Sequence, residues 1–165
     1  MRVVVQRVLE SSVLIDEKEK RNIDKGLMLL VSFTYNDTIE DIDYMINKVS
    51  NLRIFDDDNG NMNLSVKDIN GEILLISQFT LYADSKKGNR PSFNKCLKYE
   101  LAKPLYDEFV NRFKNNYKNI KTGEFGSDMK VSLINDGPVT IIIDTKEELW
   151  EKLIIRWSIS YLFYL

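Results

Sequence analysis

The feature that most constrains the fold of this chain is the segment 135–140, Asn-Asp-Gly-Pro-Val-Thr, between apolar runs at 129–134 and 139–143. Pro138 has no N–H to donate to a β-ladder, and Gly137 can adopt backbone angles that are closed to other residues. The residue before a proline is also disfavoured in the helical region. The segment therefore predicts a rigid turn that ends one strand before the next begins. Local sequence alone favours a trans bond at this turn, since cis forms make up only about 5–6% of X-Pro bonds in folded proteins.

The composition is that of a single soluble globular domain. The chain has 165 residues, 44% of them hydrophobic and 29% charged, with a net charge of −2. A nucleic-acid partner would need a local basic patch, because the overall charge does not attract phosphate. The N-terminus shows strand-like alternation and no secretory signal pattern, which predicts a cytoplasmic protein.

Two residue counts limit the chemistry. The chain has one cysteine, Cys96, which excludes an internal disulfide, and it has no histidine. A Ser-His-Asp triad, a Cys-His pair and a His-rich zinc site are therefore impossible. No metal site and no cofactor are expected, and any hydrolysis must proceed without imidazole.

Apolar periodicity predicts a set of short strands. Residues 2–9 and 11–15 are close enough in sequence to pair as a hairpin, and the continuous apolar run 26–33 is typical of a strand buried on both faces. Further strands are expected at 72–76, 118–122, 130–135 and 139–144.

Two amphipathic helices are predicted between these strands. In the first, at 39–51, Asp37 or Thr38 serves as the N-cap and apolar residues recur at helical spacing. In the second, at 97–113, an apolar stripe recurs every four residues, at Leu101, Leu105, Phe109 and Phe113.

Two further segments have alternative interpretations. The acidic segment 56–61 resembles a calcium loop, but its oxygen ligands do not fall at the positions that an EF-hand requires, so a plain turn is favoured. The tail, residues 145–165, is unusually apolar, and Trp150, Leu153, Ile154 and Trp157 have helical spacing. Arg156 interrupts the apolar run at a length well below the roughly 20 residues that a membrane span needs. Packing on the domain or on a partner subunit is favoured over a surface anchor or a non-native end.

A second polar segment, Ser77-Gln78-Phe79-Thr80, follows the strand predicted at 72–76. Side chains at strand ends commonly serve either local hydrogen bonding or function. This segment and residues 135–140 resemble the two signature motifs of the D-aminoacyl-tRNA deacylases. Four other blocks resemble the same family in the same order: residues 1–8, 51–55, 87–93 and 122–126.

The resemblance implies both a fold and an activity. The fold would be α/β (α+β): a single domain, residues 1–144, with a β-barrel-like mixed sheet flanked by two main helices, followed by the atypical tail 145–165 and assembled as a homodimer. The activity would be hydrolysis of the ester bond of D-aminoacyl-tRNA, which releases tRNA and the D-amino acid, with glycyl-tRNA as a further possible substrate. The alternatives are a non-catalytic tRNA-binding module of the same fold and a purely structural dimerising β-domain.

The resemblance also assigns residues to the reaction. Ser77, Gln78, Phe79 and Thr80 would form the catalytic segment, in which backbone N–H groups near Phe79 and Thr80 stabilise the developing oxyanion. A threonine hydroxyl needs an adjacent base to act as a nucleophile. Since no histidine exists to fill that role, Thr80 is expected to position the substrate or donate a hydrogen bond.

Substrate selection is assigned to other parts of the chain. Gly137 and Pro138, joined by a cis bond and supported by Arg7, would reach into the partner subunit's site and reject L-amino acids; composition alone favours Arg7 as a surface strand cation. The substrate-pocket residues would be Phe93, Met129 and Asn135, and the tRNA phosphate contacts would be Lys86, Lys87 and Arg90. Solvated-loop and core positions are the ordinary alternatives for these residues.

Overall fold

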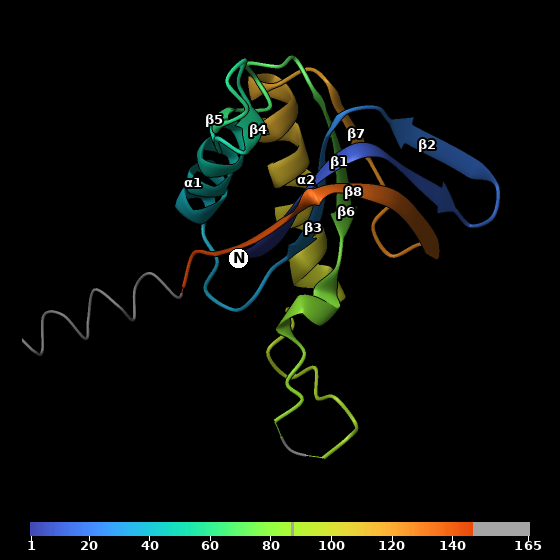
Figure 1. Ribbon diagram of the computed structural model, residues 1–165. Helices are drawn as coiled ribbons and strands as arrows, with labels where there is room; N and C mark the ends of the chain where they lie inside the picture. The colour runs from blue at the N-terminus through green and yellow to red at the C-terminus, as the bar shows by residue number, and fades with distance from the viewer. Residues whose placement is uncertain (87, 147–165) are drawn as a thin grey trace, which may run out of the picture.

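One mixed sheet forms the centre of the molecule. The computed structural model describes residues 1–86 and 88–146, and Figure 1 shows the arrangement of the elements. Within the sheet the strand order is β2-β1-β3-β6-β7, and β8 also pairs with β1. The β3–β6 and β6–β7 pairs are parallel, whereas β1 is antiparallel to each of its neighbours. The strands of this sheet are β1 (Arg2–Ile15), β2 (Glu19–Ile23), β3 (Gly26–Ser32), β6 (Glu72–Ser77), β7 (Ile120–Thr122) and β8 (Met129–Asp144).

The sheet curls until its two ends are bonded to each other. Arg21 of β2 donates a hydrogen bond to the Thr122 carbonyl of β7 over 2.7 Å, and Lys121 of β7 donates to the Asn22 carbonyl of β2 over 2.6 Å. Side chains thus connect the edges where no backbone ladder does. The predicted barrel-like mixed sheet is confirmed.

The hairpin predicted within residues 2–15 is wrong, because β1 is one continuous strand from Arg2 to Ile15. The chain reverses after Ile15, where Asp16 and Glu17 adopt positive φ angles of 47° and 57° and lead into β2. Leu9 and Glu10 are exposed and break the apolar alternation, as a turn would. They instead belong to a β-bulge, which also interrupts alternation without ending the strand.

The turn predicted at residues 135–140 is also wrong in one respect, because β8 continues through it. Residues 129–135 pair with 8–15 of β1, and residues 140–144 pair with 2–6 of the same strand. The register shifts between Gln6 and Val8, so that residues 136–139 form a bulge opposite Arg7. Pro138 lies in this bulge, where no ladder hydrogen bond is required of it.

The Gly137–Pro138 peptide bond is cis, and Gly137 has a φ of +116°. The cis geometry implied by the family resemblance is therefore confirmed, while the trans bond favoured by local sequence is wrong. Glycine suits this position because its φ lies in a region that L side chains rarely adopt.

Helix α1 (Ile39–Ser50) agrees with the prediction in position and in the face that it buries. Thr38 is the N-cap: its side chain accepts a hydrogen bond from the Asp41 N–H, and the Asp41 carboxylate accepts one from the Thr38 N–H. This capping box satisfies N–H groups that the helix itself leaves without acceptors. Ile42, Met45, Ile46 and Val49 are buried.

Helix α2 (Tyr99–Asn116) is confirmed as an element, but its buried face differs from the predicted stripe. Leu101 is 55% exposed, while the buried residues are Ala102, Tyr106, Phe109 and Phe113. An α-helix has 3.6 residues per turn, so a spacing of four drifts around the helix and by three repeats has turned about 120° away. The stripe therefore follows the core only at its C-terminal end.

Two apolar clusters lie on opposite faces of the sheet. The larger contains Leu27, Leu29 and Val31 of β3 together with the buried faces of both helices, and the smaller contains Met28 of the same strand. Alternate residues of a strand point to opposite faces. The helices therefore cover one face, and the curved sheet encloses the other cluster.

A small hairpin and the start of the tail complete the described fold. Strands β4 (Phe55–Asp56) and β5 (Met62–Leu64) are joined by a turn in which the Asp57 carboxylate accepts hydrogen bonds from the N–H groups of Asn59 and Asn61. The plain turn predicted for this segment is confirmed. The helical spacing predicted in the tail falls at residues 150–157, outside the described residues. Within the described part of the chain, no helix is long and apolar enough to cross a membrane.

Candidate active site

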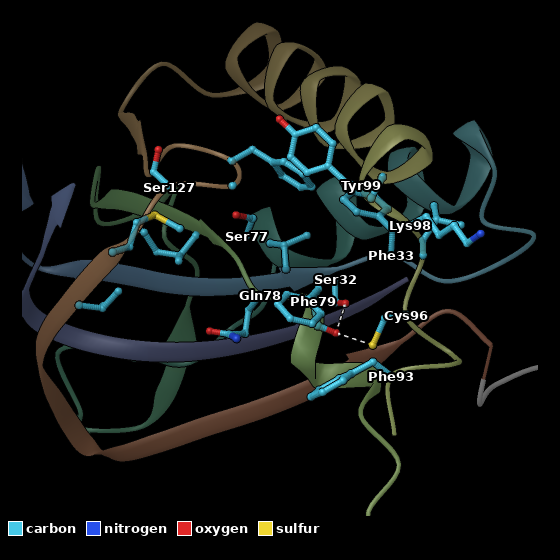
Figure 2. Close-up of a pocket in the computed structure, with 18 residues that line it drawn as sticks. Ser32, Phe33, Ser77, Gln78, Phe79, Phe93, Cys96, Lys98, Tyr99 and Ser127 are labelled. Carbon is cyan, nitrogen blue, oxygen red and sulfur yellow. Dashed lines mark hydrogen bonds between the residues drawn. The ribbon is translucent and has the colours of Figure 1, made fainter. Parts of the chain in front are cut away.

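A cavity of about 590 Å³ opens where the parallel strands β3 and β6 end. Its walls come from these strand ends, the short 3₁₀ helix η1 (Phe79–Tyr82), the segment before α2, the first residues of α2, the 125–127 loop and the start of β8. Figure 2 shows side chains from these elements converging on one space. The carboxyl ends of adjacent parallel strands are a common place for ligand sites.

Strand pairing places the Ser77–Thr80 segment at this cavity. Ser77 is the last residue of β6 and pairs with Val31 of β3, and the Gln78 N–H then donates to the Val31 carbonyl over 2.7 Å. The chain turns into η1 directly afterwards. Ser77, Gln78 and Phe79 line the cavity, whereas Thr80 is not part of its wall.

The first turn of η1 presents backbone donors. In a 3₁₀ helix each N–H bonds to the carbonyl three residues earlier, so the first N–H groups have no acceptor inside the helix. The first such bond in η1 runs from the Leu81 N–H to the Gln78 carbonyl. The N–H groups of Phe79 and Thr80 precede it, so η1 itself provides no acceptor for them.

No activated side-chain nucleophile is evident in the cavity wall. The Thr80 hydroxyl accepts a hydrogen bond from the Gln78 side-chain amide, which is not a base. Burial raises the pKa of the Cys96 thiol, so this side chain is protonated at neutral pH and is a poor nucleophile. The cavity wall thus combines polar groups with apolar side chains.

Two aromatic side chains border the cavity. The rings of Phe79 and Phe93 lie 5.5 Å apart at an interplanar angle of 57°, and the two residues are 56% and 45% exposed. Exposed aromatic pairs provide apolar surface for a planar ligand group. Met129 lines the cavity from β8, so two of the three predicted pocket residues lie in its wall.

The third predicted pocket residue, Asn135, is not part of the cavity wall. Its amide group donates to the Thr140 hydroxyl over 2.9 Å and accepts a hydrogen bond from the Val139 N–H over 3.2 Å. Both bonds span the bulge that contains Gly137 and Pro138. In this chain Asn135 stabilises the bulge, because its side chain replaces the backbone pairing that is lost there.

Arg7 is buried at 6% exposure and is not a surface cation. Its Nε donates to the Asp136 carbonyl over 3.2 Å and lies 3.1 Å from the Asp136 carboxylate, while Nη1 donates to the Ile54 carbonyl over 2.7 Å. Arg7 thus ties the bulge to the segment after α1. Gly137 and Pro138 are exposed, and neither lines the cavity of its own chain.

The basic loop, residues 83–98, extends away from the body of the molecule between η1 and α2 (Figure 1). Its base is held by a bridge between Asp84 and Ser92. Lys86 and Arg90 are exposed on it, and Lys87 lies outside the described residues. Neither of the two described cations lines the cavity.

Sequence reasoning missed several cavity residues, including Ser32, Lys98, Tyr99 and Ser127. They come from three separate parts of the chain, and only Ser32 lies at a strand end, as a single polar residue after an apolar run. Cys96 was noted only because it has no disulfide partner. The packing of the loop before α2 and of the 125–127 loop around the end of β3 brings these residues together.

The fold and the cavity define a class of small α+β proteins whose cavity opens at the ends of a parallel strand pair. The profile of the family described as D-Tyr-tRNA(Tyr) deacylase matches residues 4–144. The chain is 55% identical over 148 residues to a D-aminoacyl-tRNA deacylase of Clostridium novyi (strain NT), and 58% identical over 149 residues to one of Flavobacterium psychrophilum. Each match covers 90% of this chain and 99% of the relative. The chain therefore belongs to the D-Tyr-tRNA(Tyr) deacylase family.

Solved structures agree with this assignment. A protein described as c-Myc DNA Unwinding Element Binding Protein has a TM-score of 0.83 and 38% identity, over 88% of this chain and 99% of that one. A probable eukaryotic D-amino acid tRNA deacylase has a TM-score of 0.76 over 87% of this chain and 98% of that one. At 17% identity the second likeness concerns the fold alone.

Proposed function

We propose that this protein hydrolyses the ester bond between a D-amino acid and the terminal ribose of tRNA. The observation that carries the proposal is the match to D-aminoacyl-tRNA deacylases over nearly their whole length, and it is supported by the position of Ser77, Gln78 and Phe79 in the cavity wall. The products are free tRNA and the D-amino acid. The protein is thus a hydrolase of carboxylic esters.

In the proposed mechanism, backbone donors stabilise the charge that develops on the ester carbonyl. The N–H groups of Phe79 and Thr80 at the start of η1 bind the oxyanion as water attacks. Donors held in place before the reaction are effective because they need no reorganisation in the transition state. An aminoacyl ester is intrinsically labile, and the vicinal ribose hydroxyl assists the attack, so no side-chain nucleophile is required.

The cavity accommodates the aminoacyl end of the tRNA. Its volume of about 590 Å³ lies within the range of about 300–1,000 Å³ that is usual for small-molecule sites. Phe79, Phe93 and Met129 supply apolar surface. Outside the cavity, phosphate contacts from Lys86, Lys87 and Arg90 hold the tRNA. The protein acts on its substrate in the cytoplasm.

Chiral selection is assigned to a second copy of the chain. Gly137 and Pro138 are exposed and do not line the cavity of their own chain, which supports a role in the site of another subunit. In the proposed homodimer their two carbonyl oxygens face the position of an L side chain. Rejection then arises from steric overlap and from carbonyl groups left without partners, and it requires no affinity for the D side chain.

The proposal is tested by measuring deacylation of D-Tyr-tRNA and L-Tyr-tRNA side by side. We expect rapid hydrolysis of the D-ester and no acceleration for the L-ester. Equal rates on both would contradict the chiral filter. Binding of tRNA without turnover of either ester would identify a non-catalytic tRNA-binding module.

Replacing Thr80 tests the backbone mechanism. Thr80→Ala removes the hydroxyl but keeps the N–H group, so we expect kcat to remain within about tenfold of the wild-type value, which is less than the 10²–10³ lost with a true oxyanion donor. Complete loss of turnover, with the fold and tRNA affinity unchanged, would instead assign the chemistry to the Thr80 hydroxyl.

A further inference from the structure

The carbonyl oxygen of Phe79 is the acceptor for two side chains from different parts of the fold. Ser32 Oγ, at the end of β3, donates to it over 3.2 Å, and Cys96 Sγ, from the segment before α2, also donates over 3.2 Å. Both donors are buried, at 2% and 7% exposure. Figure 2 shows the two bonds meeting at this single oxygen atom.

The geometry of the peptide unit links this oxygen to the proposed site. Among the described residues the cis peptide bond is Gly137–Pro138, so the bond between Phe79 and Thr80 is trans. In a planar trans peptide the C=O and the following N–H point in opposite directions. Fixing the Phe79 carbonyl therefore fixes the direction of the Thr80 N–H.

The two donors are themselves held by neighbouring backbone bonds. The Cys96 N–H donates to the Phe93 carbonyl over 2.9 Å, and the next residue, Leu97, donates to the Phe33 carbonyl over 3.3 Å. Phe33 follows Ser32 directly, so one backbone bond ties the Cys96 segment to the Ser32 segment. The Phe79 carbonyl therefore accepts hydrogen bonds from two side chains whose backbone segments are bonded to each other.

Accepting hydrogen bonds at the carbonyl also strengthens the amide as a donor. Hydrogen bonds in a chain polarise one another, by about 10–30% per bond in condensed-phase estimates. The thiol must be protonated to donate, and burial favours this state by raising the pKa of Cys96. Ser32 is the stronger donor of the two, since a thiol is a weak one.

We propose that Ser32 and Cys96 are positioning residues for the deacylation reaction, which orient the Thr80 N–H and strengthen it as an oxyanion donor. This inference rests on the proposed function. It assigns neither residue a contact with the reacting atoms. Substituting either residue should lower kcat and leave KM nearly unchanged, because an oxyanion exists only in the transition state and in the intermediates next to it.

The test compares Ser32→Ala, Cys96→Ala and the double variant with wild-type protein in steady-state hydrolysis of D-Tyr-tRNA. Full removal of one oxyanion donor lowers kcat by about 10²–10³. The N–H group remains in these variants but is held less firmly, so the decrease should be smaller. We expect kcat to fall by about tenfold in Ser32→Ala, about threefold in Cys96→Ala and about thirtyfold or more in the double variant. KM should stay within about twofold, since substrate binding in the ground state is unaffected. A loss confined to KM would overturn the inference.

Cys96→Ser separates hydrogen bonding from packing. Serine is similar in size to cysteine and keeps a donor, so kcat should return to within about twofold of wild type, whereas Cys96→Ala should not recover. Equal kcat values for Cys96→Ser and Cys96→Ala would show that the hydrogen bond is irrelevant. Thermal unfolding of each variant identifies any loss that comes from unfolded protein.

Ser50 provides a control for the loss of a buried serine hydroxyl. Ser50 Oγ, at the end of α1, is buried and has no hydrogen-bond partner among the described residues. Ser50→Ala removes a buried hydroxyl without disturbing the cavity, so kcat should be unchanged. An inactive wild-type protein would refute the proposed function itself, whereas an active wild type with unchanged Ser32 and Cys96 variants would refute only this inference.

Discussion

Replacing Arg7 by methionine should destabilise the protein far more than its position on a strand would suggest. Methionine retains much of the side-chain length and apolar stem of Arg7 but removes the charge and the donors. The Ile54 carbonyl then loses a charged donor 2.7 Å away, and Asp136 loses the interaction of its carboxylate and its carbonyl with Nε.

The magnitude follows from the burial of each partner. Ile54 is 5% exposed, and loss of a charged hydrogen bond to such a group costs about 1.5–3 kcal/mol. The Asp136 side chain is 33% exposed and can be rehydrated, so its share is about 0.5–1 kcal/mol. The sum is about 2–4 kcal/mol.

The assay is urea unfolding at one fixed protein concentration. With a slope of about 2 kcal/mol per molar urea, Arg7→Met should lower the midpoint by about 1–2 M. Arg112→Met is the matched control, because Arg112 of α2 pairs at the surface with Glu108 of the same helix and with Asp43 of α1, and such pairs contribute about 0–1 kcal/mol each. Equal midpoint shifts for the two variants would refute the reasoning.

Three further perturbations test other parts of the structure. A Cβ on Gly137 would lie 2.9 Å from Val139 Cγ2 and 3.0 Å from Arg7 Nη2, at a φ of +116°, so Gly137→Ala should displace the bulge and reduce the ratio of D- to L-Tyr-tRNA hydrolysis; an unchanged ratio would contradict the filter. Reversing the charges of Lys86 and Arg90 should weaken tRNA binding and reduce the slope of log K against log salt by about 0.7–0.9 per lost phosphate contact, while an unchanged slope would leave them as solvated cations. Burial alone would raise the pKa of Asp41, but hydrogen bonds from Lys146 and the N-cap outweigh it and hold the pKa below its ordinary value. The ionised carboxylate therefore stabilises the folded protein above its unfolded-state pKa, and this contribution is lost as the pH falls. The difference in unfolding free energy between wild type and Asp41→Asn should decrease between about pH 6 and about pH 3. A constant difference would show that Asp41 does not contribute to acid unfolding.

The sequence was most informative where a local pattern and the tertiary structure demand the same thing. The apolar run at 26–33 could be assigned to a buried strand because no other short element buries every side chain. The start of α1 could be predicted to within one residue, with Asp37 or Thr38 as the N-cap, because capping bonds are local, and the structure identifies Thr38. Ser77 was expected at the end of a buried strand, and it is the last residue of β6 and lines the cavity there.

The errors have a common physical origin in long-range pairing. Breaks in alternation at Leu9–Glu10 and at Gly137–Pro138 indicate local irregularity, but a bulge and a turn break the pattern in the same way. Only the partner strand decides between them, and here β1 and β8 are each other's partner. Ser32 and Cys96 could not be predicted for a similar reason, because their shared acceptor is a backbone oxygen that has no sequence signature.

The bulge in β1 also bears on how the chain can vary in length. Val3 and Val5 belong to the cluster beneath the helices, whereas Val13 and Ile15 belong to the cluster on the opposite face. All four have odd numbers, so a regular strand would point them to the same side, and the irregularity around Val8 makes the difference. Inserting one residue after Val8 would turn Val13 and Ile15 to the opposite face of the strand and remove both from their apolar cluster. Insertions and deletions among natural relatives should therefore occur mainly in the β4–β5 turn and the basic loop. The segment of β1 around Val8 should have the same length in all of them.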